Sequence, residues 1–145
     1  MPARALRLLP GIWAGGLLCI AALAAPAAFA VLPTADAGRV VGQVFVREAW
    51  LSLGLAALLL WGQRRSAVVH GGIGNGVLLW GTVACTLVGY FALQPLMPAA
   101  RAGHGGLSFG QLHLISTAFY ALKTALVLLL AWRAAGLEVS RRPSS

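Results

Sequence analysis

Four long apolar runs alternate along the chain with shorter segments rich in proline, glycine and arginine. A transmembrane helix needs about 20 consecutive, mostly apolar residues. The pattern predicts helices over residues 8–32, 42–62, 73–93 and 112–132, followed by a short basic tail over 133–145. We therefore predict an all-α protein, an integral membrane four-helix bundle formed by a single domain over residues 1–145.

The second run is the weakest of the four. Its strongly apolar part covers only residues 49–62, so a full crossing requires the helix to start near Gly42. That start places Arg47 and Glu48 in the outer part of the membrane. An interfacial ion pair between them, at the beginning of the helix, is the simplest expectation.

Composition favours a lipid environment. The 145 residues are 59% hydrophobic and 10% charged, with a mean hydropathy of +0.84, whereas soluble domains carry about 25% charged residues. A small domain has too much surface to hide so many apolar side chains from water. The net charge of +8 comes from eleven scattered Lys and Arg residues. Because these form no basic face, no nucleic-acid partner is expected.

The arginines predict the orientation, because positive charge concentrates in cytoplasmic loops. The side that holds both chain ends and residues 63–72 carries Arg4, Arg7, Arg64, Arg65, Arg133, Arg141 and Arg142. The other side carries Arg39, Arg47 and Arg101. We predict a bacterial inner (cytoplasmic) membrane with both termini in the cytoplasm. Residues 28–30 resemble a signal-peptide cleavage site, but the first run is longer than a usual signal core, so an uncleaved helix is expected.

An internal repeat relates the two halves. Residues 32–39 align with residues 97–104 at an offset of 65, with Pro, Ala and Gly coinciding. The repeat predicts two helix hairpins related by a pseudo-two-fold axis along the membrane normal. In this frame Glu48 corresponds to His113, so the two side chains could face each other near the outer surface.

Lys123 is the most informative residue, because it lies near the middle of the last run, where charge is costly and usually functional. Helical spacing places a polar stripe on its face, formed by His113, Ser116, Thr117, Tyr120 and Thr124. We expect the stripe to face the bundle interior or a partner subunit. The alternative is that Lys123 snorkels to the cytoplasmic interface. No carboxylate is expected at its depth, which leaves backbone carbonyls, Tyr120 or lipid phosphate as partners.

Several motifs resemble the bacterial branch of the transmembrane-protein-205-like family. They are residues 37–41, 48–50, 91–97 and 107–113, with Ser116 and Leu122-Lys123. The resemblance runs from about Leu8 to Arg133 and implies a four-helix membrane domain of unknown function, without catalytic residues. A more distant similarity to copper-resistance-D-like membrane proteins raises a metal or haem hypothesis.

The remaining candidate chemistry is sparse. His70, His104 and His113 lack metal-ligand spacing, and Cys19 and Cys85 lie inside apolar runs. The sequence contains no GxSxG, HExxH, CxxC or phosphate-loop motif. We predict no metal site and no cofactor, and we expect a protein that is not an enzyme.

Three functions stay open at this point. The first is a non-enzymatic scaffold or accessory subunit of a membrane process, whose partners are the lipid bilayer and either further copies of the chain or a larger membrane complex. The second is an oligomeric transporter or permeation element for a small solute or metal. The third is a haem- or copper-binding membrane protein.

Overall fold

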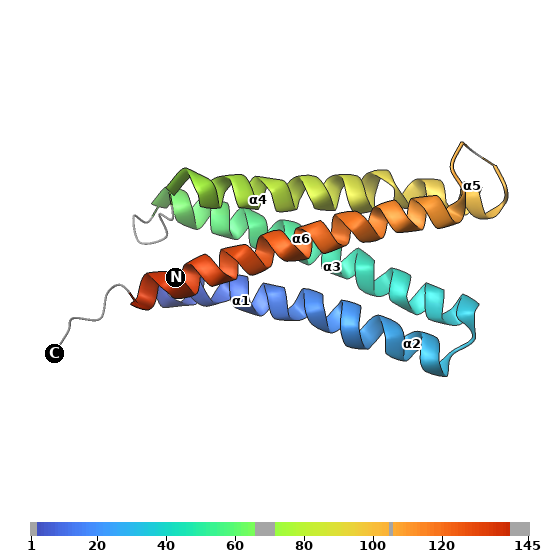
Figure 1. The fold of residues 1–145 in the computed structure, drawn as a ribbon, viewed down its shortest axis with the longest axis horizontal. Helices are drawn as coiled ribbons and strands as arrows, with labels where there is room; N and C mark the ends of the chain where they lie inside the picture. Colours follow the sequence, from blue (N-terminus) through green and yellow to red (C-terminus); the bar gives the residue numbers. More distant parts are fainter. Residues whose placement is uncertain (1–2, 66–71, 105, 140–145) are drawn as a thin grey trace.

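The computed structural model describes residues 3–65, 72–104 and 106–139. Over these residues the chain is all-α and forms four long rods that run side by side (Figure 1). Each rod contains a segment long and apolar enough to cross a membrane: Leu6–Val31, Thr34–Arg64, Gly74–Arg101 and Phe109–Gly136. The predicted all-α fold with four helices of membrane-spanning length is therefore confirmed.

The first and third rods are each built from several helical pieces. The first contains α1 (Ala3–Cys19), the π-helix η1 (Ile20–Ala24) and α2 (Ala25–Val31). The third contains α4 (Gly72–Thr86), the π-helix η3 (Leu87–Ala92), the 3₁₀-helix η4 (Gln94–Leu96) and α5 (Met97–Arg101). The second and fourth rods are the single helices α3 (Thr34–Arg65) and α6 (Phe109–Val139).

The second helix begins earlier than the sequence predicted. Leu32 is extended because the residue before a proline avoids the helical region. Pro33 then starts α3, since its carbonyl accepts 2.9 Å hydrogen bonds from the backbone N–H groups of Asp36 and Ala37. The predicted start near Gly42 is therefore wrong, and the polar residues before it belong to the helix.

The fourth helix also exceeds its predicted range of 112–132 at both ends. The first part of the predicted basic tail, residues 133–139, continues α6 as helix. The rest of that tail, residues 140–145, lies outside the described residues.

The central helix of the bundle is α6. It packs along both α1 and α4, while α3 packs against α4 and the hairpin partner α2, and Figure 1 shows α6 crossing between the first and third rods. The apolar core lies between these helices and includes Trp13, Leu17, Leu59, Leu79 and Val127.

The π-helices η1 and η3 lie in the first and third rods, and α6 bonds to the backbone of both rods. Ser116 Oγ donates to the carbonyl of Gly89 inside η3, at 2.8 Å. A Cβ at Gly89 would lie 2.5 Å from Cβ of Phe119, so a glycine is required for this close approach.

The predicted pseudo-two-fold relation between the two helix hairpins stays a prediction.

Candidate functional site

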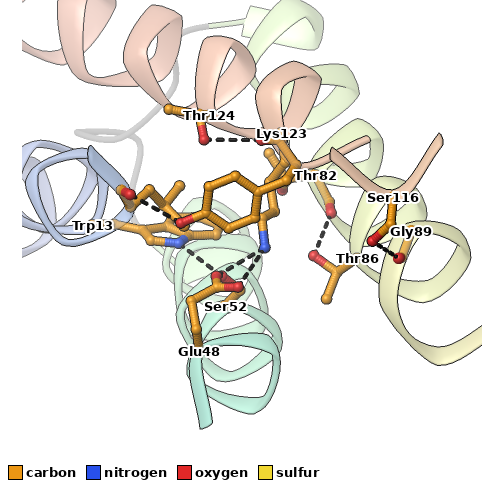
Figure 2. A network of polar contacts seen from close by, with 11 residues as sticks. Trp13, Glu48, Ser52, Thr82, Thr86, Gly89, Ser116, Lys123 and Thr124 are labelled. Atoms are coloured by element: carbon orange, nitrogen blue, oxygen red, sulfur yellow. Dashed lines mark hydrogen bonds and ion pairs between the residues drawn. The ribbon is translucent and has the colours of Figure 1, made fainter. Parts of the chain in front are cut away.

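An ion pair lies buried between the second and fourth rods. Nζ of Lys123, on α6, is 2.8 Å from both Oε1 and Oε2 of Glu48, on α3. Both side chains are almost fully enclosed, with 4% and 5% of their surface exposed. Figure 2 shows the lysine reaching from α6 towards the carboxylate. This pair joins two helices that are 75 residues apart along the chain.

The carboxylate of Glu48 has a second donor on its own helix. Ser52 lies one turn further along α3, on the same face, and its hydroxyl donates to Oε1 of Glu48. The indole N–H of Trp13, on α1, donates to Oγ of Ser52 at 3.0 Å. A buried chain of hydrogen bonds therefore runs from α1 through α3 to α6 (Figure 2).

The lysine is also covered by an aromatic ring. Nζ of Lys123 lies 4.9 Å from the ring centroid of Tyr120, within the range of a cation–π contact. The phenol O–H donates to the backbone carbonyl of Leu17 at 2.9 Å, and the ring of Phe45 packs edge-on at 5.2 Å. The hydrogen bond and the ring contact fix the position of the Tyr120 ring beside the ammonium group of Lys123.

The polar atoms of this site are satisfied. The positive and negative charges cancel, so the membrane interior holds a neutral pair instead of two separate ions. In the part of the chain that the structure describes, Nε of Arg7 is the single buried side-chain nitrogen or oxygen without a hydrogen-bond partner. Removing one member of a buried pair typically costs 3–5 kcal/mol, because a charge is left uncompensated. The arrangement is therefore suited to holding the helices in one register.

Only part of the predicted polar stripe faces this site. Thr124 is buried and donates to the carbonyl of Tyr120 at 2.9 Å, and Ser116 is half-buried against η3. Thr117 and His113 are exposed. Thr117 donates to the carbonyl of His113, whose ring stacks on Phe109 with centroids 6.0 Å apart. The bundle interior therefore surrounds only part of the stripe, because α6 turns these two residues outward, and their contact with a partner subunit stays a prediction.

Four hypotheses about Glu48 and its neighbours are corrected. Arg47 is exposed and Glu48 is buried, so they form no interfacial pair, because adjacent helical residues point in different directions. Lys123 does not snorkel but stays inside the bundle. A carboxylate does lie at its depth, because α3 starts at Thr34 and about 21 Å of helix precedes Glu48 at 1.5 Å per residue. Since Glu48 binds Lys123, it does not pair with His113.

Sequence reasoning missed two members of the network. The spacing of four residues between Glu48 and Ser52 was a usable signal, because such residues share a helix face. Trp13 gave no local signal, since it comes from another helix. Two further buried hydroxyls near the site, Thr82 and Thr86 (Figure 2), bond to carbonyls of their own helix at 2.7 and 2.9 Å.

The described residues contain no group of three or more His, Cys, Asp or Glu side chains placed to hold a metal ion. Cys19 is exposed and Cys85 is buried, and neither forms a disulfide. His70, one of the histidines considered from the sequence, lies outside the described residues.

The four apolar helices and their buried charge pair define a polytopic membrane protein with a helical bundle fold. A family model described as Domain of unknown function (DUF4149) matches residues 8–105, and the chain belongs to that family. The match covers the first three spans and includes Glu48, while Lys123 lies beyond it. Nothing in this match connects the chain to the transmembrane-protein-205-like family, so that resemblance stays a prediction. No curated protein and no solved structure matches the chain.

Proposed function

We propose that this protein is a non-enzymatic scaffold or accessory subunit of a membrane process, located in a bacterial inner membrane with both termini in the cytoplasm. The observation that supports this role is the pairing of Lys123 with Glu48. Lys123 and Glu48 are bonded to each other, and Glu48 is linked through Ser52 to Trp13. These bonds hold the helices in fixed positions, so that the bundle has a stable outer face to which a partner can bind.

The outer face of α1 is suited to close contact with another helix. Gly11, Gly15 and Cys19 follow one another at intervals of four residues, so they share a face. All three are exposed, and a Cβ built at either glycine meets nothing within 4 Å. Small residues at such spacing let transmembrane helices approach closely. We assign this face to a partner subunit, which is either a second copy of the chain or another membrane protein.

Cys19 allows a direct test of this assignment. In a Cys85→Ala background, a benzophenone attached to Cys19 is photolysed in native membranes and the products are identified by mass spectrometry. We expect one dominant cross-linked protein. Gly15→Leu should abolish that product, because the leucine side chain blocks close approach. Gly54→Leu is the matched control, since Gly54 is also exposed and unobstructed but lies on α3. If the wild-type chain gives no cross-linked product with a second copy or with another protein, the scaffold role is contradicted.

A second candidate function is an oligomeric transporter or permeation element for a small solute or metal. It is supported by the ionic character of the buried site, because charged residues inside membranes often mark ion or substrate pathways. The test is flux into proteoliposomes for the wild type and for the double variant Glu48→Met with Lys123→Met. Transport predicts flux above empty vesicles that the double variant loses. Wild-type flux equal to that of empty vesicles would contradict it.

A further inference from the structure

A groove of about 690 Å³ lies at the end of the bundle remote from the first turns of α1 and the last turns of α6. Its walls come from the beginning of α3 and from η4 and α5, which Figure 1 shows at that end. Neither the buried ion pair nor the exposed face of α1 takes part in it. The groove is therefore separate from the features used for the proposed function.

The mouth of the groove is positively charged. Arg39 contributes from α3 and Arg101 from α5, and no carboxylate is among the described residues that line the groove. Asp36 lies outside the lining but bonds to Arg39, which leaves a net positive charge. The guanidinium of Arg101 lies 4.4 Å from the ring centroid of Phe109, and this contact orients it. Guanidinium groups bind phosphate oxygens through paired N–H donors.

Other lining residues add amide donors and an apolar wall. Gln43, on α3, and Gln94, in η4, both line the groove, and a glutamine amide offers two N–H donors. Val46 and Met97 supply apolar surface. Along α3, Val46 lies about 10 Å deeper into the span than the arginine at the mouth, at 1.5 Å per residue. The groove thus changes from cationic to apolar towards the membrane interior.

We propose that this groove binds an anionic phospholipid, with the lipid phosphate at Arg39 and Arg101 and the glycerol region against Val46. A soluble phosphate compound shares the chemistry of the charged mouth. The apolar wall and the location at the end of membrane-spanning helices favour the lipid. Gly42 makes the space available, because a Cβ built there would meet nothing within 4 Å.

The proposal is tested by native mass spectrometry of the purified full chain, titrated with phosphatidylglycerol or with phosphatidylcholine. We expect the wild type to retain phosphatidylglycerol in preference to the zwitterionic lipid. The double variant Arg39→Gln with Arg101→Gln should lower affinity for phosphatidylglycerol about thirtyfold or more, because two positive charges beside the lipid phosphate are lost. Asp36→Asn should raise that affinity by up to about fivefold, since it releases Arg39 from an exposed ion pair.

Steric variants locate the site independently of charge. Gly42→Leu should fill the groove and reduce retention of phosphatidylglycerol, whereas Gly54→Leu, on the same helix outside the groove, should leave it unchanged. Equal retention of the two lipids by the wild type, full retention by the double arginine variant, or equal loss in both glycine variants would overturn the proposal. Displacement of the lipid by an equal concentration of glycerol phosphate would overturn the lipid as occupant and assign the groove to a soluble phosphate compound.

Discussion

Replacing the two charged residues of the buried pair, singly and together, measures what the pair does for the bundle. Lys123→Met keeps the length of the side chain but removes its charge, so the Glu48 carboxylate keeps only the Ser52 hydroxyl as donor. Glu48→Met leaves the lysine ammonium with the Tyr120 ring but without a counter-ion. Each single variant isolates one buried ion. The double variant removes both charges and keeps similar side-chain volume.

The expected changes in the free energy of unfolding are not additive between the single variants and the double variant. Each single variant should lose about 3–5 kcal/mol, the typical cost of leaving one buried charge unpaired. The double variant should range from about 1 kcal/mol less stable, for the lost hydrogen bond from Ser52, to about 4 kcal/mol more stable than the wild type. The sum of the two single losses should therefore exceed the loss in the double variant by at least about 5 kcal/mol. Arg47→Met is the control, because this exposed neighbour should change stability by no more than about 0.5 kcal/mol.

Tryptophan fluorescence during titration with sodium dodecyl sulfate in mixed micelles reports the unfolding. Trp13 is 4% exposed and bonded to Ser52, whereas the other four tryptophans are between 49% and 79% exposed. The signal change on unfolding should therefore come mainly from Trp13. Single effects that simply add in the double variant would refute the reasoning. A double variant less stable than either single variant would also refute it.

Further predictions concern the helix contacts and the orientation. Gly89→Ala should lower the free energy of unfolding by about 1–3 kcal/mol, because the new methyl group overlaps Phe119; the same titration measures it. Tyr120→Phe should lose about 0.5–1.5 kcal/mol, since the hydrogen bond to the α1 backbone disappears. For orientation, a reporter active only in the cytoplasm should work when fused after Ser145 and fail when inserted at Gly106.

Matched variants separate these effects from general damage. Gly54→Ala, at a helical glycine with open space around it, should be neutral or stabilising. Tyr90→Phe, at a half-buried tyrosine, controls for removing a phenol hydroxyl. Equal losses at Gly89 and Gly54, or at Tyr120 and Tyr90, would contradict the assigned contacts. A reporter active at Gly106 and silent after Ser145 would reverse the orientation.

Hydropathy and charge alone were sufficient to predict the four spans and the all-α class. These are local properties, because a run of about 20 apolar residues can cross a bilayer whatever its neighbours are. The cost of a charge in lipid likewise marked Lys123 as a residue that needs a polar environment. The sequence also contained the acidic partner, but it gave no means of ranking Glu48 above the backbone, Tyr120 or lipid phosphate.

Tertiary structure decided the pairing and the composition of the site. The depth of Glu48 depends on where α3 begins, and Pro33 and the turn before it set that start at Thr34. The direction in which the Glu48 side chain points depends on the rotation of α3 about its axis relative to α6. This rotation brings the carboxylate to Lys123 and leaves Arg47 on the outside of the bundle. Trp13 becomes part of the site through its hydrogen bond to Ser52, which is 39 residues further along the chain and on another helix. Such contacts follow from the packing of whole helices, and the periodicity of any one helix does not encode them.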